Sequence, residues 1–397
     1  MHNLRKFCFQ ACFPHRSTSP YPLTAPTLRP FAAASPDHRV ANPPLAHRSE
    51  SIFLSDDWYQ ACIESWTRRA RFRTLLLEGG PHGPVRALLG ARTELRHGVL
   101  PVRVLALNQA GIPELDQPWI ERNGFFGGRE QDFEAHLTLL LGMIDAESDW
   151  DELRLGGLSS EHARQALCLA PRHGLSGRVE LEQPSFSIDL AAIRTTHGGE
   201  YLSVLSANTR QQLRRSRRLA EQAFGALTLR EAGSIDEAHA WLDATGPLHR
   251  ARWGAPDGAT HDSGFDNPAF VAFHRRLIEL SFPRQTVQYL RLQAGDTPFA
   301  YLYNFVCAGN AHFYLSGIDY RVGERYRPGL LAHWLAIERN LGAGHHAYDF
   351  LAGDARYKRS LCTGQHRTVW LVLQRPRRRL QLEGVARRIK RRLSARS

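Results

Sequence analysis

Two carboxylates stand at the ends of predicted strands, where a side chain can reach into a cleft. Asp349 follows Tyr348 in an apolar strand pattern, and Asp319 follows Gly317-Ile318 at the end of another. A carboxylate placed in this way can act as a general base that takes a proton from a reacting nucleophile. The alternative for either residue is structural: each can cap a turn or pair with a neighbouring arginine.

A second candidate site is the start of a predicted helix at residue 328. Proline suits the first helical turn because its missing N–H would be unpaired there. The amides of that turn point out of the helix at the positive end of its dipole, so an anion can bind there. The predicted anion-binding residues are Arg325, Arg327, Pro328, Gly329, Leu330 and Leu331.

The elements around these residues follow from the apolar spacing. From Leu330 to Leu341, apolar residues recur at i, i+4, i+7 and i+11, which predicts a helix with one buried face. Residues 287–292 alternate as in a half-buried strand, and Gly295-Asp296 and Gly309-Asn310 are hairpin-type turn pairs, which together predict three antiparallel strands over 286–318. A further strand ends near Asp349.

Two upstream helices carry candidate substrate-binding residues. Arginines recur every four residues in the helix predicted over 201–223, and a histidine, an arginine and a tryptophan end the helix predicted over 238–253. The arginine row is either a solvated face or a basic wall for an acidic group. The residues at the end of the second helix either cap the helix and pack against the protein, or bind substrate. The candidates are Arg210, Arg214, His249, Arg252 and Trp253.

The positive charge of the chain is concentrated at its ends. Of a formal net charge of +12, residues 375–397 carry +9 and residues 1–50 carry +4, which leaves −1 for residues 51–374. Nucleic-acid binding requires a basic surface, so a nearly neutral body argues against it. The tail at 375–397 mixes apolar and basic residues, which fits either an amphipathic helix on an anionic membrane or a flexible solubilising tail.

Other features of the composition define the protein class. The six cysteines follow no paired spacing, which favours free thiols in a reducing compartment. The adjacent pair His345-His346 lacks the spacing of metal ligands, and no metal is expected. The longest apolar run, 137–144, is too short to span a membrane. Residues 1–50 are expected to be a disordered or non-native extension, and the protein is expected to be cytoplasmic.

The motifs of the second half, taken in order, resemble a known family. Gly317-Ile318-Asp319, a helix opened by Pro328-Gly329, residues 348–354 and Tyr357-Lys358 are arranged as in acetyltransferase domains of the CelD/BcsL type, within the GNAT superfamily of acyl-CoA transferases. The likeness covers about residues 186–361. The chain departs from the pattern in two places, because its phosphate-binding turn lacks Gly-x-Gly and Leu361 stands where a bulky aromatic is often found.

The resemblance implies an α/β fold of two tandem GNAT-like domains, each a mixed, mostly antiparallel sheet flanked by helices. Residues 51–185 loosely repeat the order of elements of the second half, as in tandem FemAB-like transferases, and would form a degenerate domain. Residues 186–374 would form the acyltransferase domain. The co-substrate implied is acetyl-CoA or a longer acyl-CoA, with its pyrophosphate at residues 328–331.

By the same resemblance, Tyr357 and Lys358 are candidates to protonate the leaving thiolate or to bind an acidic substrate. Asp349 or Asp319 would be the base. Three functions stay open. The first is acyl transfer to an amine or hydroxyl of a small or envelope-related saccharide acceptor, with contact to the inner membrane through 375–397. The second is FemAB-like transfer from aminoacyl-tRNA, and the third is a non-catalytic accessory role in polysaccharide biosynthesis.

Overall fold

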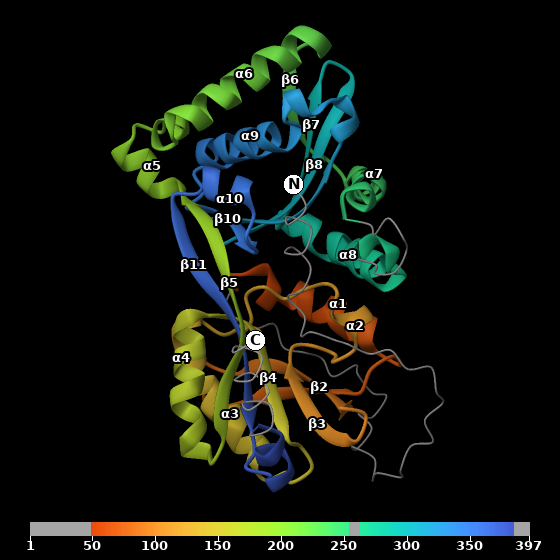
Figure 1. Ribbon diagram of the computed structural model, residues 1–397, viewed down its shortest axis with the longest axis vertical. Helices are drawn as coiled ribbons and strands as arrows, with labels where there is room; N and C mark the ends of the chain where they lie inside the picture. The colour runs from red at the N-terminus through yellow and green to blue at the C-terminus, as the bar shows by residue number, and fades with distance from the viewer. Residues whose placement is uncertain (1–48, 254–262, 385–397) are drawn as a thin grey trace, which may run out of the picture.

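The computed structural model describes residues 49–253 and 263–384, whose strands form one continuous sheet (Figure 1). The eleven strands lie in the order β1-β2-β3-β4-β11-β5-β10-β9-β8-β7-β6. Their bounds are Phe72–Leu77 (β1), Val85–Arg96 (β2), Leu100–Leu107 (β3), Glu152–Ser159 (β4), Ser176–Asp189 (β5), Leu227–Glu231 (β6), Val287–Ala294 (β7), Thr297–Cys307 (β8), Asn310–Ile318 (β9), Ala347–Ala352 (β10) and Gly364–Gln374 (β11).

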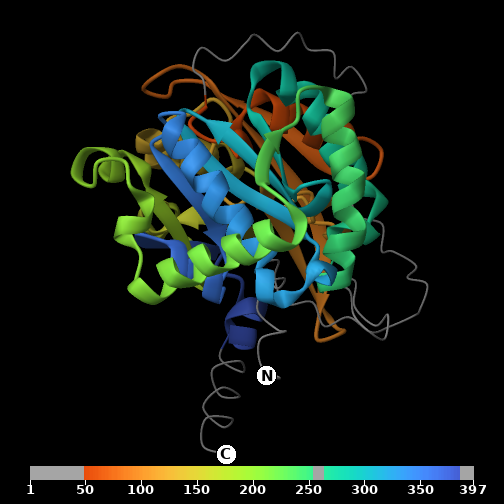
Figure 2. The same cartoon turned by 90° about the horizontal axis from the view of Figure 1, so that it is seen from above.

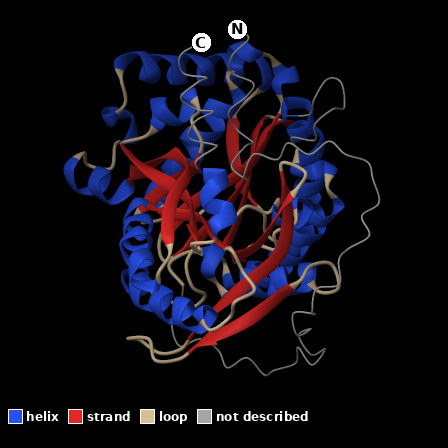
Figure 3. Cartoon of the chain, turned by 60° about the horizontal axis from the view of Figure 1, so that its bottom comes forward, coloured by secondary structure: helices blue, strands red, loops and turns tan. Residues whose placement is uncertain are grey.

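Helices lie on both sides of the strands, as Figures 2 and 3 show from two further directions. Their bounds are Asp56–Trp66 (α1), Pro113–Asp116 (α2), Phe133–Asp145 (α3), Ser160–Leu169 (α4), Leu190–Thr196 (α5), Ala207–Phe224 (α6), Ile235–Trp253 (α7), Pro268–Ser281 (α8), Pro328–Gly342 (α9) and Arg356–Leu361 (α10). No described helix is long and apolar enough to cross a membrane. The α/β fold class predicted from the sequence is confirmed.

The order of elements in the first half recurs in the second. In each half, a helix precedes three antiparallel strands, and a helix, a strand, a short helix and a long strand follow. The two parallel pairings occupy the same place in both halves, between β3 and β4 and between β9 and β10. The sheet is therefore mixed but mostly antiparallel, as predicted for GNAT-like halves.

The last strand of each half lies next to the other half. Strand β5 pairs with β10 of the second half, and β11 pairs with β4 of the first half. Strands β5 and β11 also pair with each other along eleven residue positions, and Figure 1 shows them running together through the middle of the molecule. Because of this exchange, the two predicted sheets form one, and the predicted domain boundary at residues 185/186 falls inside β5.

A single core joins the halves on one side of the sheet. Trp58 of α1 is 1% exposed, and its ring lies 5.0 Å from that of Phe273 on α8 and 6.2 Å from that of Phe305 on β8. Phe53, which precedes α1, also contacts Phe305, at 6.2 Å between ring centroids. Separate cores lie under α3 and α4 in the first half and under α6 and α9 in the second.

Several local predictions are confirmed, and one strand was missed. The three antiparallel strands are β7, β8 and β9, and the predicted helix is α9. Strand β5 begins nine residues before the strand predicted at 185–190. Strand β11 was not predicted, because its long apolar run lies next to the basic tail and shows little alternation: all six residues from Thr368 to Leu373 are buried. Such runs are typical of central strands.

The first part of the basic tail, residues 375–384, packs against the first half of the protein. Leu380 is 1% exposed and packs with Val102 and Val104 of β3. Arg379 donates to the Asp151 carboxylate at 2.6 Å, and Arg375 lies 3.4 Å from that of Asp145. Residues 375–384 are therefore part of the folded body, whereas the extension predicted at 1–50 lies outside the described residues except for its last two positions.

The shared core predicts that the two halves unfold together. We expect Trp58→Ala to lower the free energy of unfolding by about 3–5 kcal/mol, the usual cost of deleting a buried tryptophan side chain. Denaturant unfolding followed by fluorescence and circular dichroism should show one transition, shifted as a whole. Val99→Ala is the control, because Val99 is 80% exposed and its loss should change stability by less than about 0.5 kcal/mol. Two transitions, of which only one shifts, would contradict the shared core.

Candidate active site

The two parallel strands of the second half separate in front of α9. Strands β9 and β10 pair only over three residues, ending at His312 opposite Asp349. Beyond this point β10 forms a bulge, in which Leu351 has a φ of 57°. The backbone N–H of Leu351 donates to the Asp349 carboxylate at 2.8 Å, so this side chain fixes the bulge.

Asp349 is held as an anion by groups from both halves. Arg122, from the loop between α2 and α3, forms an ion pair with it, and His312 Nδ1 lies 3.6 Å from its Oδ2. Burial alone would raise the pKa of this carboxyl group, but the Arg122 charge and His312 together hold it well below its usual range. Asp349 is therefore a weak proton acceptor, and its geometry fits a role in positioning Arg122 and the bulge.

The neighbouring carboxylate Glu121 shows the opposite shift. Its Oε2 accepts from the backbone N–H of Ala352 at 2.7 Å, in the bulge of β10. Burial raises the pKa of Glu121 to about 7, and the charge of Lys358 offsets only part of this effect. The Lys358 ammonium donates to the carbonyl oxygens of Leu351 and Ala352, at 3.3 and 2.6 Å. Glu121 therefore titrates in the range that suits a general base.

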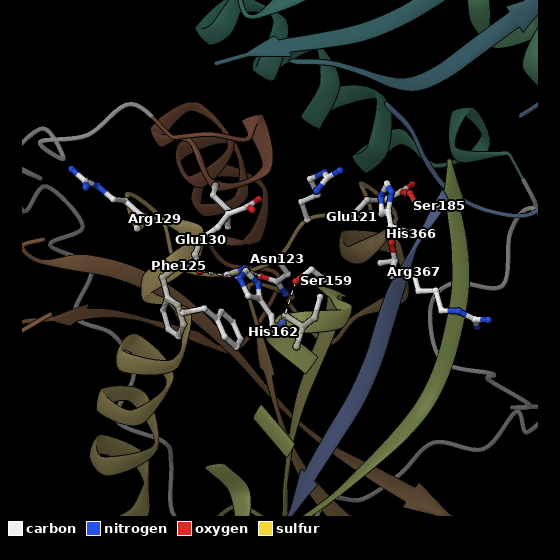
Figure 4. Close-up of a pocket in the computed structure, with 18 of the residues that line it drawn as sticks. Glu121, Asn123, Phe125, Arg129, Glu130, Ser159, His162, Ser185, His366 and Arg367 are labelled. Carbon is white, nitrogen blue, oxygen red and sulfur yellow. Dashed lines mark hydrogen bonds between the residues drawn. The ribbon is translucent and has the colours of Figure 1, made fainter. Parts of the chain in front are cut away.

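Glu121 lines a pocket that lies between the two halves. The pocket has about 40 Å³ of space accessible to water, and part of it is open to solvent. Figure 4 shows Glu121 with Ser185, His366 and Arg367 at one side, and Phe125 and Glu130 at the other. Gly157, at the end of β4, allows the loop to approach, because a Cβ there would lie 2.4 Å from the Ile120 carbonyl oxygen. This close contact places Glu121 and Arg122 against β10.

The predicted catalytic residues are only partly brought together. Lys358 is 6% exposed and lies with Asp349 around the bulge. Tyr357 stacks on His333 with ring centroids 5.0 Å apart. Asp319 caps the 3-10 helix Tyr320–Val322 and pairs with Arg321 at 2.7 Å, which is the structural alternative weighed for it. Its pKa is lowered, first by the hydrogen bond from Arg321.

The predicted donor-binding residues lie at the start of α9. Pro328 occupies the first turn, and the preceding Arg327 is in the left-handed region, with a φ of 47°. The Arg327 guanidinium lies against the Gln212 side chain of α6, oriented so that the amide oxygen accepts. Arg325 lies over the ring of Tyr326, 4.7 Å from its centroid. The two arginines are therefore near the helix start but already engaged.

The predicted substrate-binding residues lie on separate surfaces. Arg210 donates to the carbonyl of Leu205, while Arg214 is exposed on α6. His249 is 7% exposed and bonded to Ser263 at 2.9 Å, and burial lowers its pKa to about 4. Near it, Arg252 lies 5.5 Å from the centroid of the Trp253 ring.

Sequence reasoning missed the contribution of the first half. Glu121 and Arg122 reach the second half although they were placed in a degenerate domain, and His312 was not considered. The only available signal was a charged pair in front of a glycine-rich run, Gly124 to Gly128, that precedes a predicted helix. Nothing in the spacing of these residues indicates that they meet Asp349, because the contact spans 227 positions.

Comparison with known proteins finds a family model that matches part of the chain. Residues 207–359 match the model of the acetyltransferase (GNAT) domain. Among solved structures, FemX is similar with a TM-score of 0.53 and 9% identity, covering 82% of this chain and 93% of FemX. A conserved protein of unknown function from Bacteroides thetaiotaomicron VPI-5482 has a TM-score of 0.50 and 10% identity, covering 82% of this chain and 92% of that one.

These structural likenesses show the fold, and none of them shows the narrower CelD/BcsL type. A comparison with curated proteins finds no match. The GNAT match contains the separated strands β9 and β10 and helix α9, so the candidate donor site lies within it. Glu121 and Arg122 lie outside the GNAT match.

The raised pKa of Glu121 predicts a pH dependence of stability. The folded protein keeps a proton on Glu121 that the unfolded chain has already lost above its ordinary pKa. This contribution to stability is complete below the unfolded pKa and is lost as the pH rises through about 7. Between pH 5 and pH 8 we expect the wild-type protein to lose on the order of 2 kcal/mol more unfolding free energy than Glu121→Gln does.

Denaturant titrations at both pH values measure this difference. Glu200→Gln is the matched control, because Glu200 is exposed and should keep the wild-type profile. An equal change of unfolding free energy with pH in the wild type and in Glu121→Gln would contradict the raised pKa of Glu121.

Proposed function

We propose that this protein is an acyl-CoA-dependent transferase that passes an acyl group to an amine or hydroxyl by direct attack in a ternary complex. The observation that carries the proposal is the separation of β9 from β10 beyond His312 and Asp349, together with helix α9, within the segment that matches the GNAT domain. In general, an extended ligand can pair with the edge of a strand where two strands separate, and a helix N-terminus favours anions.

The start of α9 fits the pyrophosphate of CoA in two respects. Its first-turn amides have no partner within the helix. Gly329 also leaves room, since a Cβ at this position would make only ordinary contact with Ile318, at 3.7 Å. Arg325 and Arg327 would add positive charge at the ends of their side chains. The bound CoA thioester would supply the acyl group, and no metal is part of the proposal.

In this proposal, the bulge of β10 is the reacting centre. Asp349 holds Arg122 and the bulge in place, and the buried Lys358 is the cation nearest to the backbone at Leu351 and Ala352. A cation there would stabilise negative charge on the leaving thiolate, and Tyr357 lies in the preceding position of α10. Asp319 is engaged in its turn and receives no catalytic role.

For the acceptor, we propose a small or saccharide-linked molecule of the cell envelope or of polysaccharide biosynthesis, in line with the resemblance to CelD/BcsL-type proteins. The enzyme would act in the cytoplasm, with contact to the inner membrane through its basic tail. Since residues 375–384 are docked on the first half, the membrane contact would rest on residues 385–397, which lie outside the described residues.

A second candidate function is transfer from aminoacyl-tRNA. The fold similarity to FemX favours it, and the nearly neutral body argues against it. A truncated protein that lacks residues 1–48 and 385–397 can be tested for tRNA binding, which separates an effect of the basic ends from a binding site on the body. Truncation at these points leaves the docked segment 375–384 in place. Binding that survives the trimming at physiological salt would favour the tRNA-dependent reaction over the acyl-CoA reaction.

The donor site predicts that Gly329→Asp weakens acyl-CoA binding. The added carboxylate would stand at the start of α9 and repel a pyrophosphate, so we expect affinity for acetyl-CoA, or for a longer acyl-CoA that binds the wild type, to fall at least tenfold by calorimetry. Gly329→Ala is the matched control, because it adds the Cβ without charge and should retain binding. A wild-type protein that is folded but binds none of a series of acyl-CoA chain lengths would overturn the donor assignment.

The same experiments address a non-catalytic accessory role. Release of free CoA from a bound acyl-CoA, detected with a thiol reagent, should fall in Lys358→Ala. Unchanged complementation of a deletion strain by Asp349→Asn and by Lys358→Ala would favour an accessory function.

A further inference from the structure

The strands of the first half end at one level, at the lower end of the molecule in Figure 1. Val104 of β3 pairs with Glu152 of β4, and Gln374 of β11 pairs both with Glu152 and with Ser176 of β5. The residues just beyond these positions, which we call the lower rim, are Arg103, Asp151, Leu175 and residues 375–379.

The hairpin of β2 and β3 extends past the lower rim. Its strands stay paired as far as Arg96 and Leu100, and Val99 lies five residues beyond Val104. At about 3.3 Å per residue, the tip therefore projects roughly 15 Å from the rim. Val99 is 80% exposed and Leu95 is 50% exposed. Apolar residues scattered singly over a surface are ordinary, but these two share one projecting tip.

The segment that follows the rim adds a third apolar side chain beside the hairpin. Leu380 packs on β3, and the Glu383 carboxylate lies 3.5 Å from Arg96 and 3.4 Å from His97 at the end of β2. Leu382, between these two anchors, is 72% exposed. The hairpin and this segment therefore present apolar side chains at the same end of the molecule.

The lower rim has more arginines than carboxylates to pair with them. Asp151 is fully buried, and three arginines share its carboxylate: Arg379 at 2.6 Å, Arg103 at 3.5 Å and Arg377 at 3.6 Å. A single carboxylate neutralises only one of these three charges, so positive charge remains on the rim.

The partners of the other rim arginines are mostly neutral. Arg375 donates to the backbone carbonyl of Asp145 at 2.9 Å, and Arg377 donates to that of Ser148 at 2.6 Å. A carbonyl oxygen binds a guanidinium group without cancelling its charge. Asp145 and Asp149 also act on the charge of Arg375, but both are exposed to solvent, which screens them.

A hollow lies between the rim arginines and the start of β5. Arg375, Arg377, His173 and Leu175 are among the residues that line it, and it has about 210 Å³ of space accessible to water. A single water needs only roughly 10–15 Å³ of such space, so a phosphate group fits here. Arginine presents several N–H donors in a plane and is suited to binding phosphate.

We infer that the lower rim and the β2–β3 hairpin form a docking surface for an anionic phospholipid membrane. The arginines bind lipid phosphates, while Leu95, Val99 and Leu382 enter the boundary of the acyl chains. Apolar faces of membrane-surface proteins enter about 5–10 Å, which is less than the projection of the hairpin, so the arginines stay at the level of the head groups.

The sequence that follows has the matching charge. Residues 385–397 contain six Lys/Arg and no acidic residue. The inference extends to the folded body the membrane contact that we proposed for those residues, and it does not depend on the transferase reaction. A membrane with anionic lipids attracts such basic segments.

Vesicle binding by the full-length protein tests the hairpin. The probes are vesicles of phosphatidylcholine alone and vesicles with about a third phosphatidylglycerol, and flotation measures the bound fraction. We expect binding to the anionic vesicles, at least tenfold weaker binding by Val99→Asp, and tighter binding by Val99→Trp, because tryptophan favours the membrane interface. A gain in Val99→Trp would also show that substitution at this position leaves the protein folded.

Leu76→Asp is the matched control for the hairpin. Leu76 is 46% exposed on β1, where it pairs with Arg86, outside the proposed surface. This variant should bind the anionic vesicles nearly as the wild type does. Residues 385–397 are unchanged in Val99→Asp, so its loss of binding cannot come from the tail. A wild type that does not bind anionic vesicles, or an equal effect of Val99→Asp and Leu76→Asp, would overturn the inference.

The arginines are tested by Arg377→Gln. We expect it to weaken binding to the anionic vesicles about fivefold, the usual effect of one basic residue near such a surface. Arg215→Gln, on the exposed face of α6, removes the same charge outside the proposed surface and should have less effect. Equal losses in the two variants would show that only net charge matters and would overturn the role of the rim.

Two further measurements separate this inference from its alternatives. Millimolar inorganic phosphate at constant ionic strength should leave vesicle binding largely intact, and complete displacement would overturn the membrane in favour of a site for free phosphate. Acyl-CoA binding in solution should be equal in Val99→Asp and the wild type. Vesicle binding without acyl-CoA binding would therefore refute only the donor assignment, whereas acyl-CoA binding without vesicle binding would refute only the docking surface.

Discussion

The pairing of β5 with β11 is the constraint on which the rest of the structure depends. These two strands end the two halves, and each lies next to a strand of the other half. Neither half can complete its own sheet, because the hydrogen-bonding edges of β4 and β10 are satisfied only by the exchanged strands. The exchange makes one sheet of eleven strands and fixes how the halves face each other. A site that draws on both halves can therefore be held rigidly.

Two carboxylates at this junction show that the partners of a buried carboxyl group decide whether its pKa rises or falls. Asp349 lies against Arg122 and His312, and its pKa is lowered. Glu121 is the adjacent residue to Arg122, yet its hydrogen-bond partner is a backbone amide and its pKa rises to about 7. Divergent pKa values in a pair of neighbouring carboxyl groups are typical of sites where one group positions and the other exchanges protons. The first half, although it was expected to be degenerate, contributes both Glu121 and Arg122.

The candidate site centres on one irregular point, the bulge of β10. The bulge follows the point where β9 and β10 separate, and the loop from the first half contacts it through Glu121, which lines the pocket. The backbone of Leu351 and Ala352 contacts Asp349, Lys358 and Glu121. Irregular backbone of this kind costs free energy and occurs often at functional sites. The bulge thus gives a physical reason for placing the chemistry here.

The sequence by itself determined the local elements of the second half. The spacing of Leu330 to Leu341 predicted α9, and the alternation at 287–292 with the two turn pairs predicted β7 to β9, because helical and strand periodicities depend only on near neighbours. The GNAT-like fold was implied by the resemblance of the motifs to a known family. The tertiary structure alone decided that β5 and β11 exchange, that Asp349 is paired with Arg122, and that Glu121 lines the pocket between the halves. These contacts join residues far apart in the chain, and their pKa shifts depend on burial and on partners that no local pattern encodes.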